Sequence, residues 1–321
     1  MGEPRPDVIV LGAGVIGLTT GVCLAEQGLR VQIRTRAVPS ATTSAVASAM
    51  IGPSFAPAGD PGGVRERVGI EEFTALAAVE NAGVALRRGR LVSRQAGPLP
   101  AGLELPPGAE LCAPGEVPAG FADGFWARVP LVDMPIYLDY LVRRLAAAGG
   151  WIELAEVDSL SELAEQAPLL ANCAGLGARE LVLDSSVRPV RGQQVIVDNP
   201  GLEEFFIEAP FGPAWTAYWP YPDHVVLGGT KVEGDENLEP SPALADEILR
   251  RCVEVEPRLR QAQVRGHQVG LRPERPSVRL EVEQIGNARC VHNYGHGGSG
   301  VTLSWGCAYE AAALLIDQRS R

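Results

Sequence analysis

The sequence predicts an α/β protein in which a second domain, built on a mostly antiparallel sheet, is inserted into a parallel-sheet domain. An apolar run at 8–11 leads through a glycine-rich turn into a helical pattern at 18–27 and a second apolar run at 31–33, a complete βαβ unit. Antiparallel strands separated by proline- and glycine-containing turns are predicted at 193–197, 215–219 and 225–227. Helical periodicity then returns, which predicts that the chain ends in the first domain.

The remaining helices and strands are predicted from the periodicity of apolar residues and from glycine and proline, which end such elements. Gly28 ends the first helix. The segment 57–130 is rich in proline and glycine and predicts mostly loop around one helix at 71–82. Further helices are predicted at 134–148, 242–255 and 304–316, and further strands at 151–154 and 169–173.

These elements predict a Rossmann-like nucleotide-binding domain made of three segments and an inserted domain made of two. The expected bounds of the first domain are 1–55, 129–187 and 267–321, and those of the inserted domain are 56–128 and 188–266.

The composition limits the kind of partner. The 321 residues carry a net charge of −11, which disfavours nucleic acid and anionic membrane surfaces and favours a small-molecule partner. No stretch resembles a signal peptide or membrane span, and the last residues lack a Ser-Lys-Leu-type address, so a cytoplasmic location is expected. The six cysteines show no C-x-x-C spacing, and the sequence does not decide whether two of them form a disulfide. The oligomeric state stays open between a monomer and a homodimer.

The first glycine turn has the G-x-G-x-x-G spacing, from Gly12 to Gly17, between the predicted strand and helix. Its glycines permit a tight turn, close approach of a pyrophosphate and close helix–strand packing, so it predicts dinucleotide binding. The second strand ends in Arg34 and Arg36 where an acidic ribose partner is expected. Either these arginines meet the 2′-phosphate of NADP, or a flavin protein holds its ribose by other groups.

A second glycine-rich segment, from His292 to Gly300, leads into the last predicted helix and predicts backbone amides that contact an anion or a polar ring edge. Cys290, His292 and His296 have residue types that suit zinc, but no fourth ligand is evident. Local hydrogen bonds that shape the loop are the preferred interpretation of the two histidines.

Several further motifs carry a resemblance across most of the chain. They are the threonine-rich segment at 42–49, Asn-Cys-Ala-Gly at 172–175, Arg-Gly-Gln at 191–193, Gly-Leu-Arg-Pro at 270–273 and Trp-Gly-Cys-Ala at 305–308. Together with the two glycine segments, they resemble the D-amino-acid oxidase family of FAD enzymes.

The resemblance implies FAD as the cofactor and three groups of contact residues. Expected cofactor contacts are Gly12, Ala13, Gly14, Val15, Ile16, Gly17, Thr42, Thr43, Ser44, Gly297, Gly298, Ser299, Gly300, Val301 and Thr302. Expected catalytic and substrate-binding residues are Arg272, Tyr218 and the backbone of Gly298. No metal is expected to be bound.

Arg272 also has an argument of its own, because a planar guanidinium between Gly270 and Pro273 offers a two-pronged donor to a carboxylate. The alternative is a surface arginine paired with Glu274 or Glu281. Tyr218 is separated from Pro220 by one residue where the family has two, so either Tyr218 or Tyr221 is expected to face the substrate.

The predicted activity is oxidative deamination of neutral or apolar D-amino acids. Hydride passes from Cα to flavin N5, and dioxygen is the final acceptor, giving 2-oxo acid, ammonia and hydrogen peroxide. The run 215–221 contains no cation for an acidic side chain. The alternatives are a D-aspartate oxidase, a glycine oxidase, an NADP-dependent dehydrogenase or a flavoprotein without catalytic activity.

Overall fold

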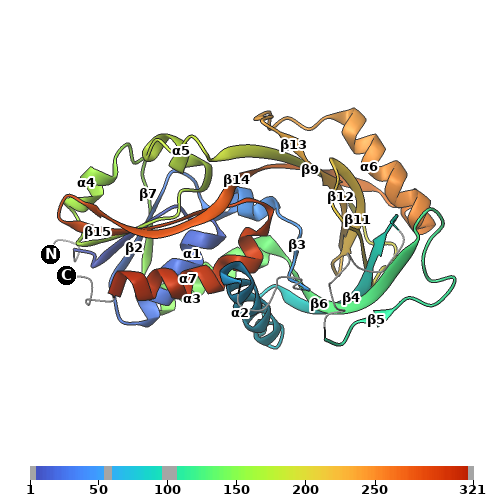
Figure 1. Ribbon diagram of the computed structural model, residues 1–321, viewed down its shortest axis with the longest axis horizontal. Coiled ribbons are helices and arrows are strands. Elements are labelled where there is room, and N and C mark those ends of the chain that lie inside the picture. Colours follow the sequence, from blue (N-terminus) through green and yellow to red (C-terminus); the bar gives the residue numbers. More distant parts are fainter. Residues whose placement is uncertain (1–4, 54–59, 96–106, 317–321) are drawn as a thin grey trace.

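The computed structural model describes residues 5–53, 60–95 and 107–316. The predicted domain boundary at 55 and 56, part of the proline-rich loop at 98–106 and the C-terminal residues lie outside these ranges. One mixed sheet runs through the molecule from end to end (Figure 1).

The parallel part of the sheet follows the order β15-β8-β1-β2-β7. Its strands are β1 (Val8–Leu11), β2 (Val31–Thr35), β7 (Trp151–Leu154), β8 (Leu169–Asn172) and β15 (Ala288–His296). Side chains alternate between two cores: Val8 and Val10 pack on one face, and Ile9 and Leu11 pack on the other. The first face is covered by α1 (Val15–Glu26), α3 (Met134–Ala147) and α7 (Gly300–Ile316), and the second by α4 (Leu160–Ala164).

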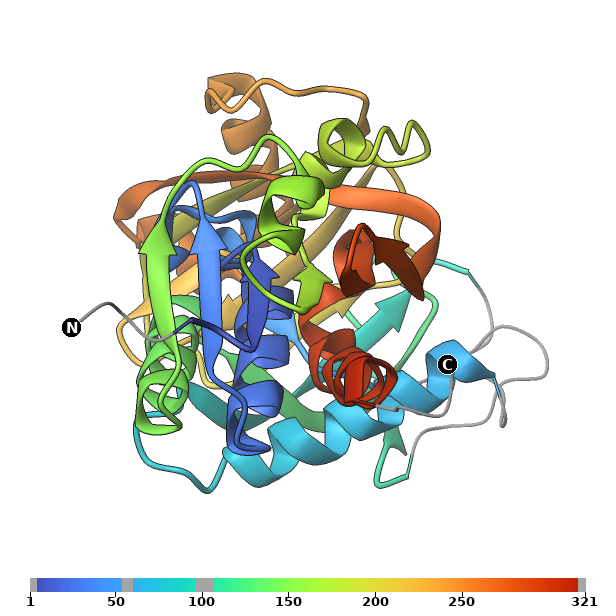
Figure 2. The same cartoon turned by 90° about the vertical axis from the view of Figure 1, so that its left-hand side faces the viewer.

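Helix α2 (Pro61–Leu76) lies next to α7, and Figure 2 shows the light-blue and red helices side by side. Asp60 caps α2 by accepting from the Gly63 amide at 2.8 Å, with Pro61 in the first helical position. Short elements complete this half: β3 (Ala49–Met50), α5 (Ala178–Leu181), and the 3-10 turns η1 (Pro39–Ala41), η2 (Thr43–Val46), η3 (Gly175–Gly177) and η5 (Gly297–Ser299).

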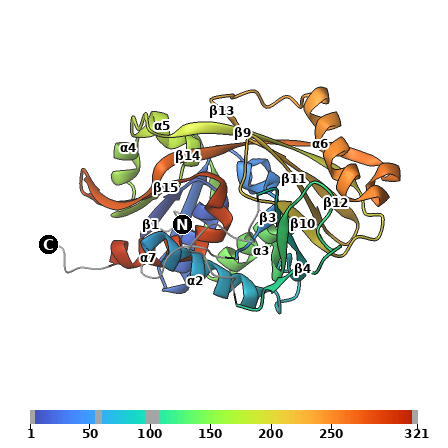
Figure 3. The ribbon, with the colours of Figure 1, turned by 45° about the vertical axis from the view of Figure 1, so that its right-hand side comes forward.

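The other half of the sheet is mostly antiparallel. It contains β4 (Val84–Ser93), β6 (Asp123–Val132), β9 (Arg188–Asp198), β10 (Phe205–Glu208), β11 (Ala214–Pro220) and β12 (His224–Thr230), with β5 (Glu110–Leu111) and β13 (Val232–Glu233) at its margins. Helix α6 (Pro242–Val255), followed by η4 (Pro257–Gln261), covers one face of β9, β11 and β12 (Figure 3).

The 22-residue strand β14 (Val264–Ile285) joins the two halves. Its first part pairs with β9 and its second part with β15, so it belongs to both ladders (Figure 1). The middle of this strand is therefore the point where the two halves of the sheet meet.

The predicted α/β class with an antiparallel second part is confirmed. The prediction that 57–130 is mostly loop was wrong, because β4 and β6 form a regular antiparallel pair there. The helix expected at 71–82 only overlaps α2, which begins and ends earlier, at Pro61 and Leu76. The segment from His292 to His296 was also misjudged, since it is strand β15. The domain bounds stay a prediction. In the part of the chain that is described, no helix is both long and apolar enough to cross a membrane.

Candidate active site

The glycine turn between β1 and α1 is shaped by close backbone packing. Gly12 has a φ of +101°, and a Cβ there would lie 2.6 Å from the Cys173 carbonyl oxygen. A Cβ on Gly17 would lie 1.9 Å from the Gly12 carbonyl oxygen. Both positions therefore require glycine. The turn points the first amides of α1, whose first turn contains no acidic residue, away from the helix toward any bound anion.

The threonine-rich segment lies directly against this turn. The Ser44 hydroxyl accepts from the Val15 amide at 2.9 Å, so η2 is fixed at the N-terminus of α1. On its other side η2 faces β14, because a Cβ on Gly270 would lie 2.8 Å from Val46 and 3.5 Å from Thr43. The residues Thr42, Thr43 and Ser44 thus lie between the first glycine turn and the strand that carries Arg272.

The second glycine segment places its turn over the same strand. Gly297 and Gly298 form η5 between β15 and α7, and Gly297 has a φ of +54°. A Cβ on Gly298 would lie 3.6 Å from Cδ of Arg272. Helix α7 starts at Gly300 without an acidic residue in its first turn. Its first amides can therefore face negative charge.

Arg272 is partly buried on β14, and burial lowers the pKa of its guanidinium. It donates to the Thr230 carbonyl oxygen at 3.2 Å and lies over Gly192, where a Cβ would come within 2.5 Å of Nη2. Among the described residues, no carboxylate forms an ion pair with it. The alternative partners are bound elsewhere, Glu274 to Lys231 at 3.1 Å and Glu281 to Arg279 at 2.6 Å. A desolvated guanidinium that forms no ion pair with a described carboxylate is a binding group for an anion.

Tyr218 is a core residue, not a neighbour of Arg272. It pairs with Leu227, which pairs with Val195, which in turn pairs with His267. His267 and Arg272 are five residues apart on β14, so their side chains lie on opposite faces of the sheet. The ring of Tyr218 stacks on Phe206 at 5.5 Å, and burial raises its pKa to about 12.

Tyr221, the other tyrosine considered, is buried, and its hydroxyl donates to the Val132 carbonyl oxygen at 3.1 Å. By the same register, Trp219 connects through Val226 and Ile196 to Gly266, six residues from Arg272. Trp219 and Gln194 therefore share the face of Arg272, and the sequence interpretation missed both. Alternate residues along 215–221 point to the same face of a strand, and this alternation could have indicated Trp219. The two tyrosines in the run drew the interpretation to themselves instead.

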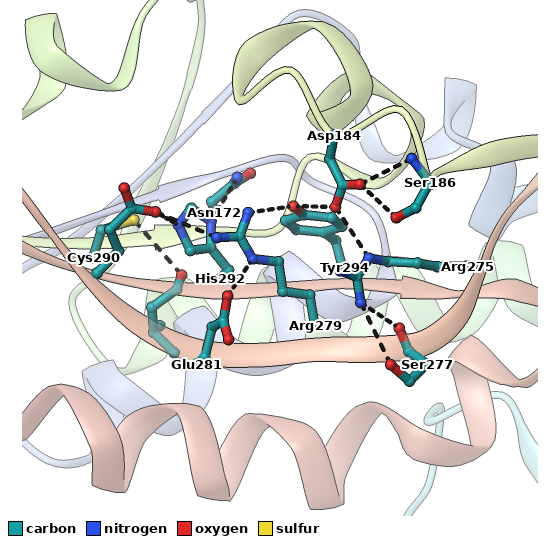
Figure 4. Close-up of polar contacts among 12 residues, drawn as sticks. Asn172, Asp184, Ser186, Arg275, Ser277, Arg279, Glu281, Cys290, His292 and Tyr294 are labelled. Carbon is teal, nitrogen blue, oxygen red and sulfur yellow. Dashed lines mark hydrogen bonds and ion pairs between the residues drawn. The ribbon is translucent and has the colours of Figure 1, made fainter.

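The two histidines of the second glycine segment differ in their environments. His292 is buried, with its ring nitrogens 3.1 Å from Asn172 Nδ2 and 2.9 Å from Glu283 Oε2 (Figure 4). His292 therefore makes hydrogen bonds as predicted, but it makes them from strand β15 to residues of β8 and β14 and not within a loop. His296 is also buried, but its Nε2 has no partner within the described residues, and burial with the nearby Arg65 charge lowers its pKa to about 3. No group of three or more potential metal ligands gathers in the described ranges.

A polar network holds β14 and β15 against the loop that precedes β9 (Figure 4). The Tyr294 hydroxyl and Arg275 Nε donate to Asp184 at 2.9 and 3.0 Å. Burial alone would raise the pKa of Asp184, but hydrogen bonds from Ser186, Tyr294 and Arg275 outweigh it and lower the pKa. Arg275 is therefore committed to Asp184 and is not a free cation beside the substrate site.

The residues fit FAD. Two glycine turns lead into the N-termini of α1 and α7, neither of which has an acidic residue in its first turn, and they lie on either side of η2 and β14, as an extended dinucleotide with a flavin at one end requires. Arg34 donates to Gln166 at 2.9 Å and pairs with Glu153, so its guanidinium is not reserved for a 2′-phosphate. The geometry defines a dinucleotide-dependent enzyme with an anion-binding group on β14.

Comparisons with known proteins agree. The model of the family described as DAO, FAD dependent oxidoreductase, matches residues 7–314. The chain is similar to a D-amino-acid oxidase of Rubrobacter xylanophilus, with 48% identity over 95% of this chain and 94% of the relative. It is also similar to human D-aspartate oxidase, with 35% identity over 97% of this chain and 94% of the relative. A glycine oxidase structure from Bacillus cereus superposes with a TM-score of 0.81 at 19% identity, covering 97% of both chains.

The protein therefore belongs to the FAD-dependent oxidoreductase family, and its cofactor is FAD. Within that family, its curated relatives of 48% and 44% identity are D-amino-acid oxidases. The NADP-dependent alternative is set aside by this membership.

Proposed function

We propose that the protein oxidises neutral D-amino acids to 2-oxo acids, with release of ammonia and hydrogen peroxide. The observation that carries the proposal is the guanidinium of Arg272, which lies beside the Gly298 turn without a carboxylate partner among the described residues. The names of the relatives support the same reaction. A D-aspartate oxidase or a glycine oxidase is the alternative within the family.

Arg272 binds the substrate carboxylate with two parallel hydrogen bonds and thereby fixes the orientation of Cα. The backbone carbonyl of Gly298 accepts from the substrate amine. With FAD bound, the amides from Gly297 to Thr302 would stabilise negative charge that develops at its edge. Bound FAD supplies the redox chemistry by accepting a hydride from Cα.

The reaction balances without a protein base in direct contact with Cα. The substrate loses a hydride from Cα and a proton from nitrogen, which gives an imino acid, and water then hydrolyses this product to the 2-oxo acid and ammonia. Dioxygen takes up the two electrons and two protons as hydrogen peroxide. His296 stays neutral near pH 7, because its pKa is lowered to about 3. The chain's own contribution is binding and orientation.

Neutral substrates are favoured because two cations near Arg272 are already paired, one next to Thr230, whose carbonyl accepts from Arg272, and one three residues further along β14. Lys231 lies 3.1 Å from Glu274, and Arg275 lies 3.0 Å from Asp184. The carboxylate of an acidic side chain would have to compete for these ions. Assays with D-aspartate and D-valine under the same conditions test the preference for neutral substrates, and faster oxidation of D-aspartate contradicts it.

The central experiment compares Arg272→Ala with Arg265→Ala. Both arginines lie on β14, but Arg265 is exposed and paired with Asp198 and Asp223. Loss of charged hydrogen bonds worth about 1.5–3 kcal/mol each raises the Michaelis constant for D-alanine at least roughly 100-fold in Arg272→Ala. Arg265→Ala keeps the wild-type value. An unchanged constant in Arg272→Ala refutes the assignment, as does holoenzyme whose flavin absorbance is not bleached by D-alanine under anaerobic conditions.

We further propose a cytoplasmic location, which the six free cysteine thiols support, since thiols stay reduced in that compartment. Fractionation of expressing cells tests it, and recovery of the protein outside the cytoplasm contradicts it.

A further inference from the structure

The face of the sheet that carries Arg272 also carries a row of small residues. Strand register places Gly192, Gly228 and Ala217 on this face, on β9, β12 and β11 in turn. Because Gly192 and Gly228 have no side chains, the Arg272 guanidinium packs directly on the backbone of Gly192, and the Trp219 ring packs on the backbone of Gly228. A Cβ would lie 2.5 Å from Arg272 Nη2 at the first glycine and 3.1 Å from the Trp219 ring at the second.

Gln194 bridges the two ends of this row. It lies two residues beyond Gly192 on the same face, about 7 Å along the strand. Its Cγ lies 3.8 Å from the Cβ position of Gly228, where the Trp219 ring also rests. A molecule held by its carboxylate at Arg272 would extend its side chain along this row, toward Gln194 and Trp219.

Both residues carry a buried polar atom that lacks a partner. Trp219 Nε1 and Gln194 Oε1 have no hydrogen bond to any described residue. Buried polar groups are nearly always paired, and an unpaired one costs about 1–3 kcal/mol. A donor and an acceptor, both on the face of the carboxylate-binding arginine, point to a ligand that completes both.

We propose that Trp219 and Gln194 read the substrate side chain and favour D-amino acids that end in a carboxamide over apolar ones of the same shape. This inference rests on the proposed function and narrows it to a substrate class. A carboxamide accepts from the indole N–H through its oxygen and donates to Gln194 through its nitrogen. A carboxylate offers no donor, and an apolar side chain leaves both protein atoms unpaired.

The test uses two near-isosteric pairs, D-asparagine with D-leucine and D-glutamine with D-methionine. Peroxide formation by the holoenzyme gives kcat/KM for each substrate. Trp219→Phe keeps the ring and removes the donor, so the ratio of amide to apolar substrate falls about 5- to 10-fold, the effect of one hydrogen bond. Gln194→Leu lowers the same ratio by a similar factor, and it carries the test where Trp219→Phe fails to bind FAD.

Trp126→Phe is the matched control, because Trp126 Nε1 already donates to Glu116 at 3.0 Å, and its substrate ratios match wild type. Trp215 also has an unpartnered indole N–H, beyond a register shift in β11. A ratio that falls in Trp215→Phe but not in Trp219→Phe or Gln194→Leu overturns the proposal. So do unchanged ratios in both Trp219→Phe and Gln194→Leu. Wild-type enzyme that oxidises none of these substrates, nor D-alanine, instead refutes the proposed function.

Discussion

Gly69 of α2 is where a single methyl group has the largest predicted effect away from the substrate. The helix crosses the first turn of α7 so closely that a Cβ on Gly69 would lie 1.8 Å from the Thr302 carbonyl oxygen. Ordinary contact begins at 3.4 Å, so Gly69→Ala forces the two helices apart by about 1.6 Å. Thr302 belongs to the turn proposed to face the flavin, so the displacement reaches the cofactor site.

Two opposing effects decide the magnitude. Alanine is a better helix former than glycine by about 1 kcal/mol. Overpacking costs about 1–3 kcal/mol, and the cost lies at or above the upper end here because the contacted atom is backbone and cannot rotate away. The net loss is about 2 kcal/mol, or about 4 °C in Tm for a chain of this size. Displaced amides at the start of α7 also weaken FAD binding, by about fivefold for each 1 kcal/mol lost.

Thermal unfolding of apoenzyme and holoenzyme measures the first effect, and titration of apoenzyme with FAD, followed by flavin fluorescence, measures the second. Gly266→Ala is the control, because no atom lies within 4 Å of its Cβ position and its backbone is not left-handed. A Gly69→Ala protein with unchanged or higher Tm and unchanged FAD affinity refutes the close crossing of α2 and α7.

Two further predictions concern buried polar groups. Asp184→Asn leaves Arg275 without its carboxylate and costs about 1–3 kcal/mol, whereas Asp198→Asn, in an exposed pair, costs at most about 1 kcal/mol, as chemical denaturation measures. Equal losses in the two variants would contradict the network. The folded-state pKa of His296 is about 3, below the ordinary 6.5. The stability that the folded state gains by holding this ring neutral is therefore complete above pH 6.5 and falls progressively toward pH 3. His296→Asn therefore flattens the pH dependence of unfolding free energy between pH 6.5 and 4.5, and an unchanged slope would show that His296 is hydrated.

The sequence predicted the parallel half well because its signals are local. The strand, glycine turn and helix from Val8 to Glu26 are contiguous, and Gly12 and Gly17 there are required by close contacts with each other and with Cys173. The start of α2 carried a usable signal too, with Asp60 as cap and Pro61 in the first turn, but the two glycines that follow concealed it.

Strands β4 and β6 were missed because their stabilising contacts are between strands. Arg88 and Arg90 make β4 look like a polar loop, yet both guanidinium groups lie over the ring of Trp126, at 3.6 and 5.0 Å from its centroid. Such a pairing appears only after the strands are aligned. The error at Tyr218 has a similar origin, because the face of a residue on β11 depends on register through β12 and β9 to β14.

Strand β14 holds Arg272 and the Gly297–Gly298 turn close together. Arg272 lies two residues before Glu274, which pairs with Arg188 of β9 on one side and with His296 of β15 on the other. The turn that follows His296 holds Gly297 and Gly298, and Gly298 is in contact distance of Arg272. Arg272 and the Gly297–Gly298 turn are thus held together by β14 and by its pairing with β15 at Glu274, ahead of the register shift in that ladder.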